Sequence, residues 1–458
     1  MRVIVVGAGI SGLSLAAHLQ AGAARDGCDI SLTILESGAR PGGHAWTTRE
    51  NGFVVEGGPN GFLDRERDPE PGELVRMLGL ESRVIEANPA ARRRFILRGG
   101  RLRRVPDGPA TLLTSDVLSP AGKIRLMLEP WARKAPAGEE SVFEFAERRI
   151  GHEAAEFLVD AAISGISAGD SRALSVGSAF PIMKEMERDH GSLIRAMIAR
   201  RGTKPARLIS FDGGMDVLIA ALRERLAANL RTGAAVRSVV RDGAEWRVVL
   251  GDGTSLTADH VALAIPAYEA ARITRDLDPR LARKLDSFPF SGLAVVALAY
   301  RNADTGPLDG YGYLVPRLEK QDTLGVLWES SVFTGRAPAG HALLRIMMGG
   351  ARRPEVAELD QAELERRARA ELARVMHIDA TPLHSWVRRW PRAIAQYDFG
   401  HAERLREVRR MAAGHRGLEL CGTSYDGISF GMAIASGAGT ARRMLAAISS
   451  EAKRLEIA

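Results

Sequence analysis

The chain has 458 residues, of which 45% are hydrophobic and 26% are charged. This balance excludes a largely disordered chain, and the length predicts two or three domains. The formal net charge of +7 leaves nucleic acid, an anionic membrane surface and an anionic small molecule open as partners.

The N-terminal residues predict a βαβ unit that binds a dinucleotide. Residues 3–6 (VIVV) are typical of a buried strand, GAGISG follows at 7–12, and a helix is expected over 13–20. In such a turn the first glycine permits the bend, the second admits a pyrophosphate, and the third lets helix and strand pack closely. A second strand over 31–35 ends at Glu36, a carboxylate placed to bind ribose hydroxyls and to disfavour a 2′-phosphate.

The next loop favours FAD over NAD. Arg40, Gly42 and Gly43 form a motif that an extended FAD needs, since its phosphates and flavin continue past the first turn. Residues 422–428 (GTSYDGI) precede a helix expected over 432–447 and offer backbone N–H groups that would cap the flavin. A surface loop and a plain helix cap are the alternatives. We predict FAD and no metal, because no His, Cys and carboxylate cluster has metal-ligand spacing.

The residues between these ends are expected to form two further domains. The pattern is mainly helical from 70 to 205 and rich in strands over 234–265 and 290–350. The return to strand, turn and helix near the C-terminus suggests one nucleotide-binding domain assembled from separate pieces. We assign 1–75, 205–268 and 405–458 to an FAD-binding domain, 76–91 and 269–404 to a substrate-binding domain, and 92–204 to a mainly helical domain.

Several motifs in this order resemble the flavin amine-oxidase and protoporphyrinogen-oxidase superfamily. The more specific motifs are EGGPNGFLD at 56–64, ISGISAGD at 163–170, FP at 180–181 with ExxHxSL at 187–193, and QYxxGH at 396–401. Together they resemble the oxygen-dependent protoporphyrinogen oxidases of haem biosynthesis, over nearly the whole chain. The resemblance implies an α/β fold (α+β overall): a Rossmann-like FAD-binding domain, an inserted substrate-binding β-sheet domain and a helical, membrane-facing domain.

The resemblance also implies an activity. Members of the family oxidise protoporphyrinogen IX to protoporphyrin IX, removing six electrons in three flavin cycles and passing them to oxygen to form hydrogen peroxide. Hydride transfer from a methylene bridge to the flavin is the implied step, so no protein general base is assigned, and His190 and His401 are interpreted as structural.

Three other functions are weighed against this one. Coproporphyrinogen III oxidation stays open because extra arginines beside Arg94 suit either substrate. An amine oxidase or a desaturase would share the fold, although aromatic residues make up only 5% of the chain, which disfavours an amine oxidase's aromatic cage. A nucleic-acid binder is disfavoured because the basic residues lack aromatic interleaving and a recognised motif.

Substrate residues follow from the resemblance alone. Arg94 falls where the family places an arginine on a substrate propionate, a pairing that a guanidinium suits. Gly165 matches a glycine whose backbone lies against substrate and flavin. Tyr311, Leu314 and Met347 match apolar positions around the macrocycle. Tyr311 departs from the family, in which phenylalanine is common. A solvated arginine and ordinary core packing are the alternatives.

The predicted cofactor residues come from the glycine motifs and from the resemblance, which supplies Val236 as a backbone contact to adenine. They are Gly7, Gly9, Ile10, Ser11, Gly12, Glu36, Ser37, Arg40, Gly42, Gly43, Gly57, Gly58, Pro59, Asn60, Val236, Gly422, Gly427 and Ile428. Residues 431–434 (GMAI) depart from the Asn/Pro-Asp-Cys-Ile run that is frequent in the family, which leaves the contacts to the flavin ring open.

The positive charge is concentrated in one segment. Residues 92–134 hold eleven Lys and Arg against three Asp and Glu, interleaved with apolar side chains. This pattern suits contact with an anionic bilayer, as does the corresponding family segment, and a solvated basic helical hairpin is the alternative. With two cysteines, no targeting segment and no long apolar stretch, we expect a cytoplasmic protein attached peripherally to the inner face of the cell membrane. Expected partners are a tetrapyrrole, molecular oxygen and a second copy of the chain, with no nucleic acid.

Overall fold

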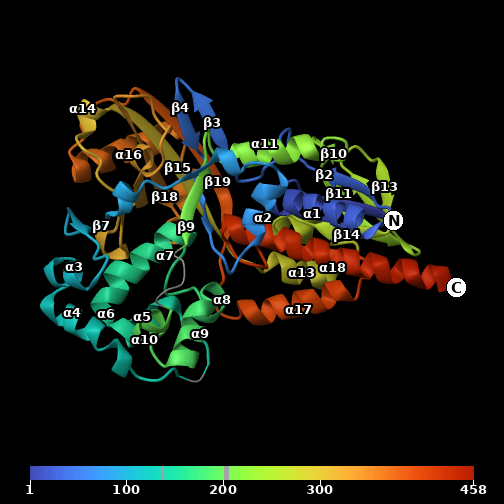
Figure 1. Cartoon of the computed structure of the whole chain (residues 1–458), viewed down its shortest axis with the longest axis horizontal. Coiled ribbons are helices and arrows are strands. Elements are labelled where there is room, and N and C mark those ends of the chain that lie inside the picture. The colour runs from blue at the N-terminus through green and yellow to red at the C-terminus, as the bar shows by residue number, and fades with distance from the viewer. Residues whose placement is uncertain (137, 201–205, 458) are drawn as a thin grey trace.

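The computed structural model describes residues 1–136, 138–200 and 206–457, which are arranged in three regions (Figure 1). The domain boundary expected at 204/205 lies outside the described residues. Both termini lie in the same region, at the end of the molecule away from the helices of residues 109–199 (Figure 1). Of the described helices, none is long and apolar enough to cross a membrane.

The first region is built on a parallel sheet with the strand order β10-β2-β1-β14-β20. Its strands are β1 (Arg2–Val6), β2 (Ser31–Leu35), β10 (Leu230–Arg231), β14 (His260–Leu263) and β20 (Leu418–Leu420). All four pairings are parallel. The apolar residues of β1 are buried, as a central strand covered on both faces requires. The predicted Rossmann-like domain is therefore confirmed, and its strands come from distant parts of the chain.

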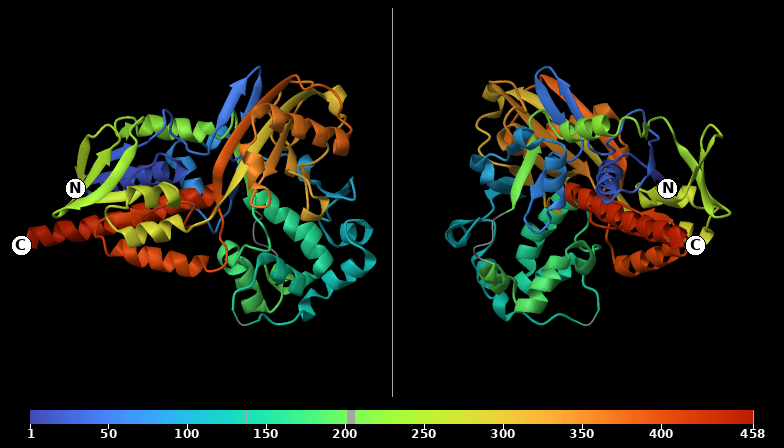
Figure 2. Two further views of the ribbon diagram at one scale, coloured as in Figure 1. Left: turned by 180° about the vertical axis from the view of Figure 1, so that it is seen from behind. Right: turned by 45° about the vertical axis from the view of Figure 1, so that its right-hand side comes forward.

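Helices and a second small sheet cover the two faces of this parallel sheet. On one face, α1 (Ile10–Asp26) and α18 (Phe430–Ile457) lie side by side (Figure 2). A side chain at Gly437 would overlap the Ser11 carbonyl oxygen, so the two helices approach as closely as glycine allows. On the other face, an apolar core around Trp246 joins the parallel sheet to an antiparallel sheet and two helices. These elements are β11 (Val236–Asp242), β12 (Glu245–Leu250), β13 (Ser255–Ala258), α12 (Ala267–Ile273) and α13 (Pro279–Asp286).

The second region is a seven-stranded sheet with the order β19-β15-β18-β17-β16-β7-β8. Its strands are β7 (Arg94–Arg98), β8 (Arg101–Arg104), β15 (Phe290–Arg301), β16 (Gly312–Leu314), β17 (Thr323–Trp328), β18 (His341–Gly349) and β19 (His384–Ala395). One face packs on α16 (Gln361–Met376) through residues such as Val296, Val326 and Ile346. The other face turns toward the first region.

The strands β7 and β8 correct the expectation of a helical pattern at 94–104. Gly99 and Gly100 both have positive φ, at 60° and 73°, and they form the two-residue turn of a β-hairpin. The hairpin was not predicted because its arginines interrupt the alternation of apolar and polar residues that is typical of a strand. The hairpin extends the seven-stranded sheet, since β7 pairs in parallel with β16.

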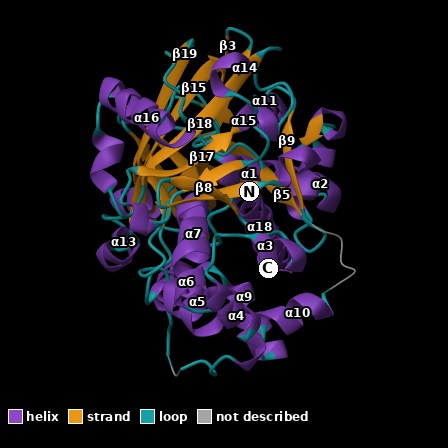
Figure 3. Cartoon of the chain, turned by 90° about the vertical axis from the view of Figure 1, so that its left-hand side faces the viewer, coloured by secondary structure: helices purple, strands orange, loops and turns teal. Residues whose placement is uncertain are grey.

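The third region is a group of short helices below the sheet (Figure 3). It comprises α3 (Pro109–Thr114), α4 (Pro120–Met127), α5 (Val142–Ile150), α6 (His152–Ala154), α7 (Asp160–Ser167), α8 (Val176–Ala179), α9 (Pro181–His190) and α10 (Leu193–Ala199). Buried ion pairs hold it together. Glu129 accepts from the Arg149 guanidinium and from the N-terminal N–H groups of α10, among them Leu193 N at 2.9 Å. The ExxHxSL motif thus has a structural role, because Ser192 also bonds to Glu129.

The remaining elements link these regions. They are β3 (Thr47–Glu50), β4 (Phe53–Glu56), β5 (Phe62–Asp64), α2 (Glu70–Met77), β6 (Val84–Glu86), β9 (Arg207–Phe211), α11 (Asp216–Arg225), α14 (Asn302–Thr305), α15 (Glu329–Val332) and α17 (His401–Ala413). Strands β5, β9 and β6 form a three-stranded sheet beside α2 and α18, and β6 is a further strand inside the segment expected to be helical.

Candidate flavin and substrate site

The first glycine turn is shaped to receive a phosphate at the N-terminus of α1. Gly7 has φ +100°, and its N–H donates to Leu35 O at 2.7 Å. A methyl group at Gly12 would overlap the Gly7 carbonyl oxygen, whereas one at Gly9 would meet no protein atom within 4 Å. Gly9 is the residue that caps α1, so the free space lies where the helix N–H groups and dipole favour an anion.

The Arg40 loop lies directly against this turn. Gly42 N donates to Ala8 O at 2.7 Å, and Gly42 bridges Gly9. The Arg40 guanidinium bonds to Asp216 at 2.7 Å and lies over the Trp46 ring at 4.3 Å, while its Nη1 is buried without a hydrogen-bond partner in the described structure. A buried cationic N–H group left unpaired next to the phosphate position is what a diphosphate cofactor would satisfy.

The end of β2 brings together the residues predicted for the adenosine half. Glu36 accepts from Ala8 N at 2.9 Å and from Gly38 N at 2.8 Å, and the Ser37 hydroxyl lies 3.3 Å from the same carboxylate. Ala234 N donates to the backbone carbonyl of Glu36 at 2.8 Å, two residues before β11 begins at Val236. Two segments some 200 residues apart in sequence therefore meet where adenine and ribose are predicted.

The EGGPN segment after β4 leads from the cofactor turn toward the seven-stranded sheet. Gly58 must be glycine because a side chain would overlap the His44 carbonyl oxygen, and its own carbonyl accepts from Arg345. Gly57 O accepts from Trp390 Nε1 at 2.6 Å. After Pro59, Asn60 Nδ2 donates to Glu329 at 3.3 Å. The backbone of this segment is thus fixed by side chains of the seven-stranded sheet.

Glu56, at the start of the same segment, is buried. Burial raises the pKa of its carboxyl to about 7, and the Arg336 charge and bonds from Met215 N and Thr47 oppose that rise. These bonds fix Glu56 to the FDGGM turn at 211–215, which explains why both motifs occur together in the sequence.

The C-terminal glycine loop completes the cofactor half. Gly422 and Gly427 have φ +119° and +107°, and a side chain at Gly422 would lie 3.5 Å from Ser11 Oγ. Ile428 is partly exposed next to them. In the departing GMAI run, Met432 packs so closely on Gly427 that any side chain there would overlap it. The loop therefore lies beside Ser11, in the first turn of α1.

The predicted substrate residues lie on the face of the seven-stranded sheet opposite α16. Leu314 pairs with Gly325, and Gly325 pairs with Met347, so these residues form one row across the sheet. A side chain at Gly165 of α7 would lie 2.5 Å from Leu314 Cδ2, so Leu314 already covers the α7 backbone there. Arg94 pairs with Gly312 at the edge of the same face.

Tyr311 lies directly before β16, three residues ahead of Leu314. Gly312, at φ +126°, turns the strand in a conformation that other residues rarely adopt, and this bend directs Tyr311 toward Arg94, whose guanidinium lies 5.4 Å from the ring. Burial and the Glu329 charge raise the pKa of the Tyr311 hydroxyl, and Asn60 opposes that rise. The hydroxyl absent from a phenylalanine is therefore sensitive to a residue predicted to contact the cofactor.

Two charged residues near Tyr311 were not predicted as site residues from the sequence. Arg345 is 5% exposed and Glu329 is fully buried, and both act electrostatically on Tyr311. Their signal was the presence of a charge inside an apolar strand (Arg345) or directly at a strand end (Glu329).

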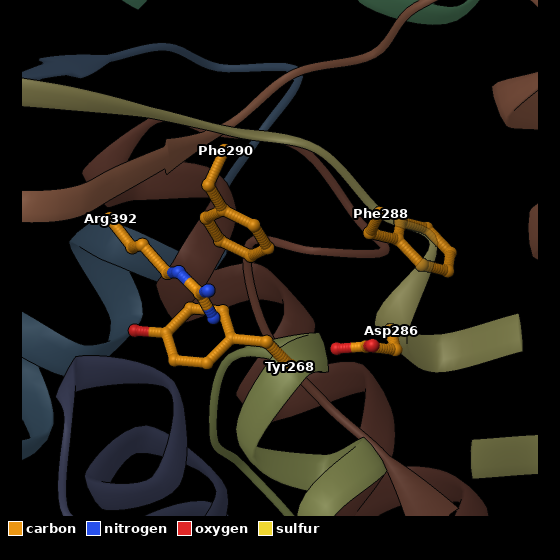
Figure 4. Close-up of a pocket in the computed structure, with 5 residues that line it drawn as sticks. All are labelled: Tyr268, Asp286, Phe288, Phe290 and Arg392. Atoms are coloured by element: carbon orange, nitrogen blue, oxygen red, sulfur yellow. The ribbon is translucent and has the colours of Figure 1, made fainter. Parts of the chain in front are cut away.

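A separate hollow lies away from the predicted site residues. A cavity of about 250 Å³ is lined by Tyr268, Asp286, Phe288, Phe290 and Arg392, with the Arg392 guanidinium along the Tyr268 ring (Figure 4). None of these is among the predicted site residues. The candidate site is therefore defined by converging backbone and side chains, not by this cavity.

Comparison with known proteins decides the family. A model of the flavin-containing amine oxidoreductases matches residues 10–445. Human protoporphyrinogen oxidase is 32% identical over 469 residues, covering 95% of this chain and 96% of the human one. The chain belongs to the flavin-containing amine oxidoreductases, in the protoporphyrinogen oxidase family.

Other relatives agree with this placement. The chloroplastic protoporphyrinogen oxidase of Oryza sativa subsp. japonica is 32% identical, covering 94% of this chain and 85% of the relative. The coproporphyrinogen III oxidase of Bacillus subtilis is 27% identical, covering 93% and 94%. A crystal structure described as a putative protoporphyrinogen oxidase from Exiguobacterium superposes with a TM-score of 0.84 at 23% identity, covering 97% and 98%, and so shares the fold.

As a member of this family, the protein is an FAD-dependent oxidoreductase. The residues present fit the cofactor on two counts: the open approach at Gly9 and the unpaired, buried Nη1 of Arg40. The individual contacts predicted for the cofactor and substrate residues stay predictions.

Proposed function

We propose that this protein oxidises protoporphyrinogen IX to protoporphyrin IX, with oxygen as electron acceptor and hydrogen peroxide as the reduced product. The observation that carries the proposal is the row of Leu314, Gly325 and Met347, which has Arg94 at its edge and the Gly58 backbone bonded to it through Arg345. An apolar surface with a guanidinium at its margin suits a flat macrocycle whose polar groups are propionates.

Bound FAD supplies the two-electron oxidation chemistry, and the chain supplies binding and orientation. Arg94 holds a propionate in place by paired hydrogen bonds, while Leu314 and Met347 exclude water from the face of the macrocycle. Gly165 lets Leu314 pack directly on the α7 backbone because it carries no side chain. Tyr311 keeps its proton, since its pKa is raised, and so presents a neutral donor beside the substrate.

The test is parallel turnover of protoporphyrinogen IX and coproporphyrinogen III under air, followed by porphyrin fluorescence. Arg94→Ala is expected to raise the KM for porphyrinogen about tenfold or more with flavin content unchanged, since a charge-assisted pairing is lost. Arg301→Ala, an exposed arginine on β15 of the same sheet, is the matched control. An equal KM for porphyrinogen in the two variants would show that Arg94 does not bind the substrate.

Coproporphyrinogen III is the second candidate substrate. It carries four propionates, and Arg92 and Arg93 lie next to Arg94, with Arg93 already paired to Asp309. The Bacillus subtilis relative bears the name of this activity. A higher kcat/KM for coproporphyrinogen III in the parallel assay would make it the physiological substrate.

We also propose that the protein attaches peripherally to an anionic membrane through residues 92–134. Large apolar side chains of this segment are exposed on the helical region: Leu113, Ile124, Met127, Leu128 and Trp131. Trp131 is 75% exposed, which is unusual for tryptophan unless it meets an apolar partner.

The apolar side chains support this proposal more than the charge does. Several of the arginines already pair with acids, namely Arg93, Arg98, Arg103 and Arg104. Trp131→Glu is expected to reduce co-sedimentation with phosphatidylglycerol vesicles severalfold. Leu318→Glu, which alters an exposed leucine outside the segment, is the control, and equal binding by both variants would exclude this surface.

A further inference from the structure

The QYxxGH motif at 396–401 has no place among the predicted cofactor and substrate residues. It follows β19 and lies between two functional elements that come from distant parts of the chain. One is the glycine loop at 422–428, and the other is the C-terminal end of α7, which carries Gly165. Its first two residues, Gln396 and Tyr397, are both buried and bond to different elements.

The Tyr397 hydroxyl forms hydrogen bonds with two backbone groups of the glycine loop. It accepts a hydrogen bond from Gly427 N at 2.6 Å and donates one to Thr423 O at 2.9 Å. One oxygen therefore holds both ends of the loop, and Gly427 N–H is buried, so that no water replaces this partner. The ring of Tyr397 is held in turn by His401, stacked at 3.8 Å with an interplanar angle of 18°.

Gln396 holds the end of α7. Its Nε2 donates to Ser167 O at 3.1 Å and to Ser291 Oγ at 3.0 Å. Ser167 is the last residue of α7, two positions beyond Gly165. A side chain at Gly169 would lie 2.6 Å from Gln396 Oε1, so the chain after α7 packs tightly against the same amide.

We propose that Tyr397 is a positioning residue for the flavin, and that Gln396 and Tyr397 together fix the spacing between the flavin loop and α7. Consecutive Cα atoms are held 3.8 Å apart by a planar peptide, so a shift of one element is passed to the other. The flavin half of the proposal follows from the family's cofactor. The α7 half rests on the proposed substrate, because Gly165 is assigned to it.

The test of the flavin half is Tyr397→Phe, which keeps the ring stacked on His401 and removes both hydrogen bonds. We expect the Kd for FAD to rise about tenfold and the visible absorption band of the bound flavin to shift, because Gly427 N–H is left unpaired. The matched control is Tyr300→Phe, which removes a buried hydroxyl that has no hydrogen-bond partner in the described structure. Melting of both apoproteins measures the fold separately.

A Tyr397→Phe protein whose Kd for FAD and flavin spectrum match those of the wild type would overturn the proposal. An equal rise in Kd for Tyr300→Phe would overturn it too, because the effect would then come from the core in general. For the α7 half, Gln396→Leu is expected to raise the KM for porphyrinogen about fivefold with the Kd for FAD within twofold. An unchanged KM would refute this half. Absence of porphyrinogen turnover by the wild type would refute the proposed function and leave the flavin comparison intact.

Discussion

Two of the three glycines in the GAGISG turn, Gly9 and Gly12, are expected to affect different properties when each is replaced by alanine. At Gly9 the added methyl meets no protein atom within 4 Å, and the backbone (φ −69°, ψ 174°) suits any residue. At Gly12 the methyl overlaps the carbonyl oxygen of Gly7, a backbone atom that cannot move without separating α1 from β1. Gly9→Ala therefore tests the cofactor, and Gly12→Ala tests the fold.

The magnitudes follow from these surroundings. In the apoprotein, Gly9→Ala lowers the entropy of the unfolded chain, which favours folding by about 0.4–1 kcal/mol, and weakens the helix cap by a similar amount. Its net effect on the free energy of unfolding is thus within about 1 kcal/mol. In the complex, the methyl occupies the approach of the pyrophosphate, an overpacking worth about 1–3 kcal/mol, which corresponds to a Kd for FAD raised roughly 5- to 150-fold.

The assay separates the two effects. Urea denaturation of each apoprotein gives the free energy of unfolding, and quenching of FAD fluorescence on binding gives the Kd. Gly12→Ala is expected to destabilise the apoprotein by about 1–3 kcal/mol or more, through overpacking. A Gly9→Ala protein that binds FAD within twofold of the wild type would refute the assignment of this turn to the pyrophosphate. If the Gly9→Ala apoprotein loses as much free energy of unfolding as the Gly12→Ala apoprotein, the claim that the space at Gly9 is free is refuted.

The remaining predictions concern burial and packing. Burial lowers the pKa of His401 to about 4, below its unfolded value, so the wild type loses stability as pH falls from about 6.5 toward 4, by about 2–3 kcal/mol at pH 4.5. His401→Phe keeps the stack on Tyr397 and is expected to lose that dependence; equal slopes of stability against pH would contradict the cause. Gly165→Ala displaces Leu314 and is expected to raise the KM for porphyrinogen severalfold with the Kd for FAD unchanged, which steady-state kinetics and FAD titration check. Trp246→Ala empties a fully buried site and is expected to cost about 3–5 kcal/mol in urea denaturation, whereas a loss below 1 kcal/mol would show that the site collapses.

The sequence by itself predicted the local structure near both ends of the chain. The GAGISG turn and the C-terminal glycine loop each combine a strand, a tight turn and a helix, and Glu36 directly follows β2. Such units are specified by neighbouring residues. Their meeting in one parallel sheet followed from the recurrence of the same pattern. The resemblance to the family added the predicted substrate residues and the predicted adenine contact at Val236.

The tertiary structure decided what depends on distant partners. Strand β19 carries arginines and a proline, and β7 and β8 carry arginines at both ends, so their alternation is visible only when the sheet pairs them. Arg345 and Glu329 became part of the site because burial beside Tyr311 gives their charge its effect. The role of Tyr397 required the fold as well, since both of its hydrogen bonds reach a loop some thirty residues away in sequence. Residue type is local, whereas pairing, burial and electrostatics depend on which distant segments share a surface.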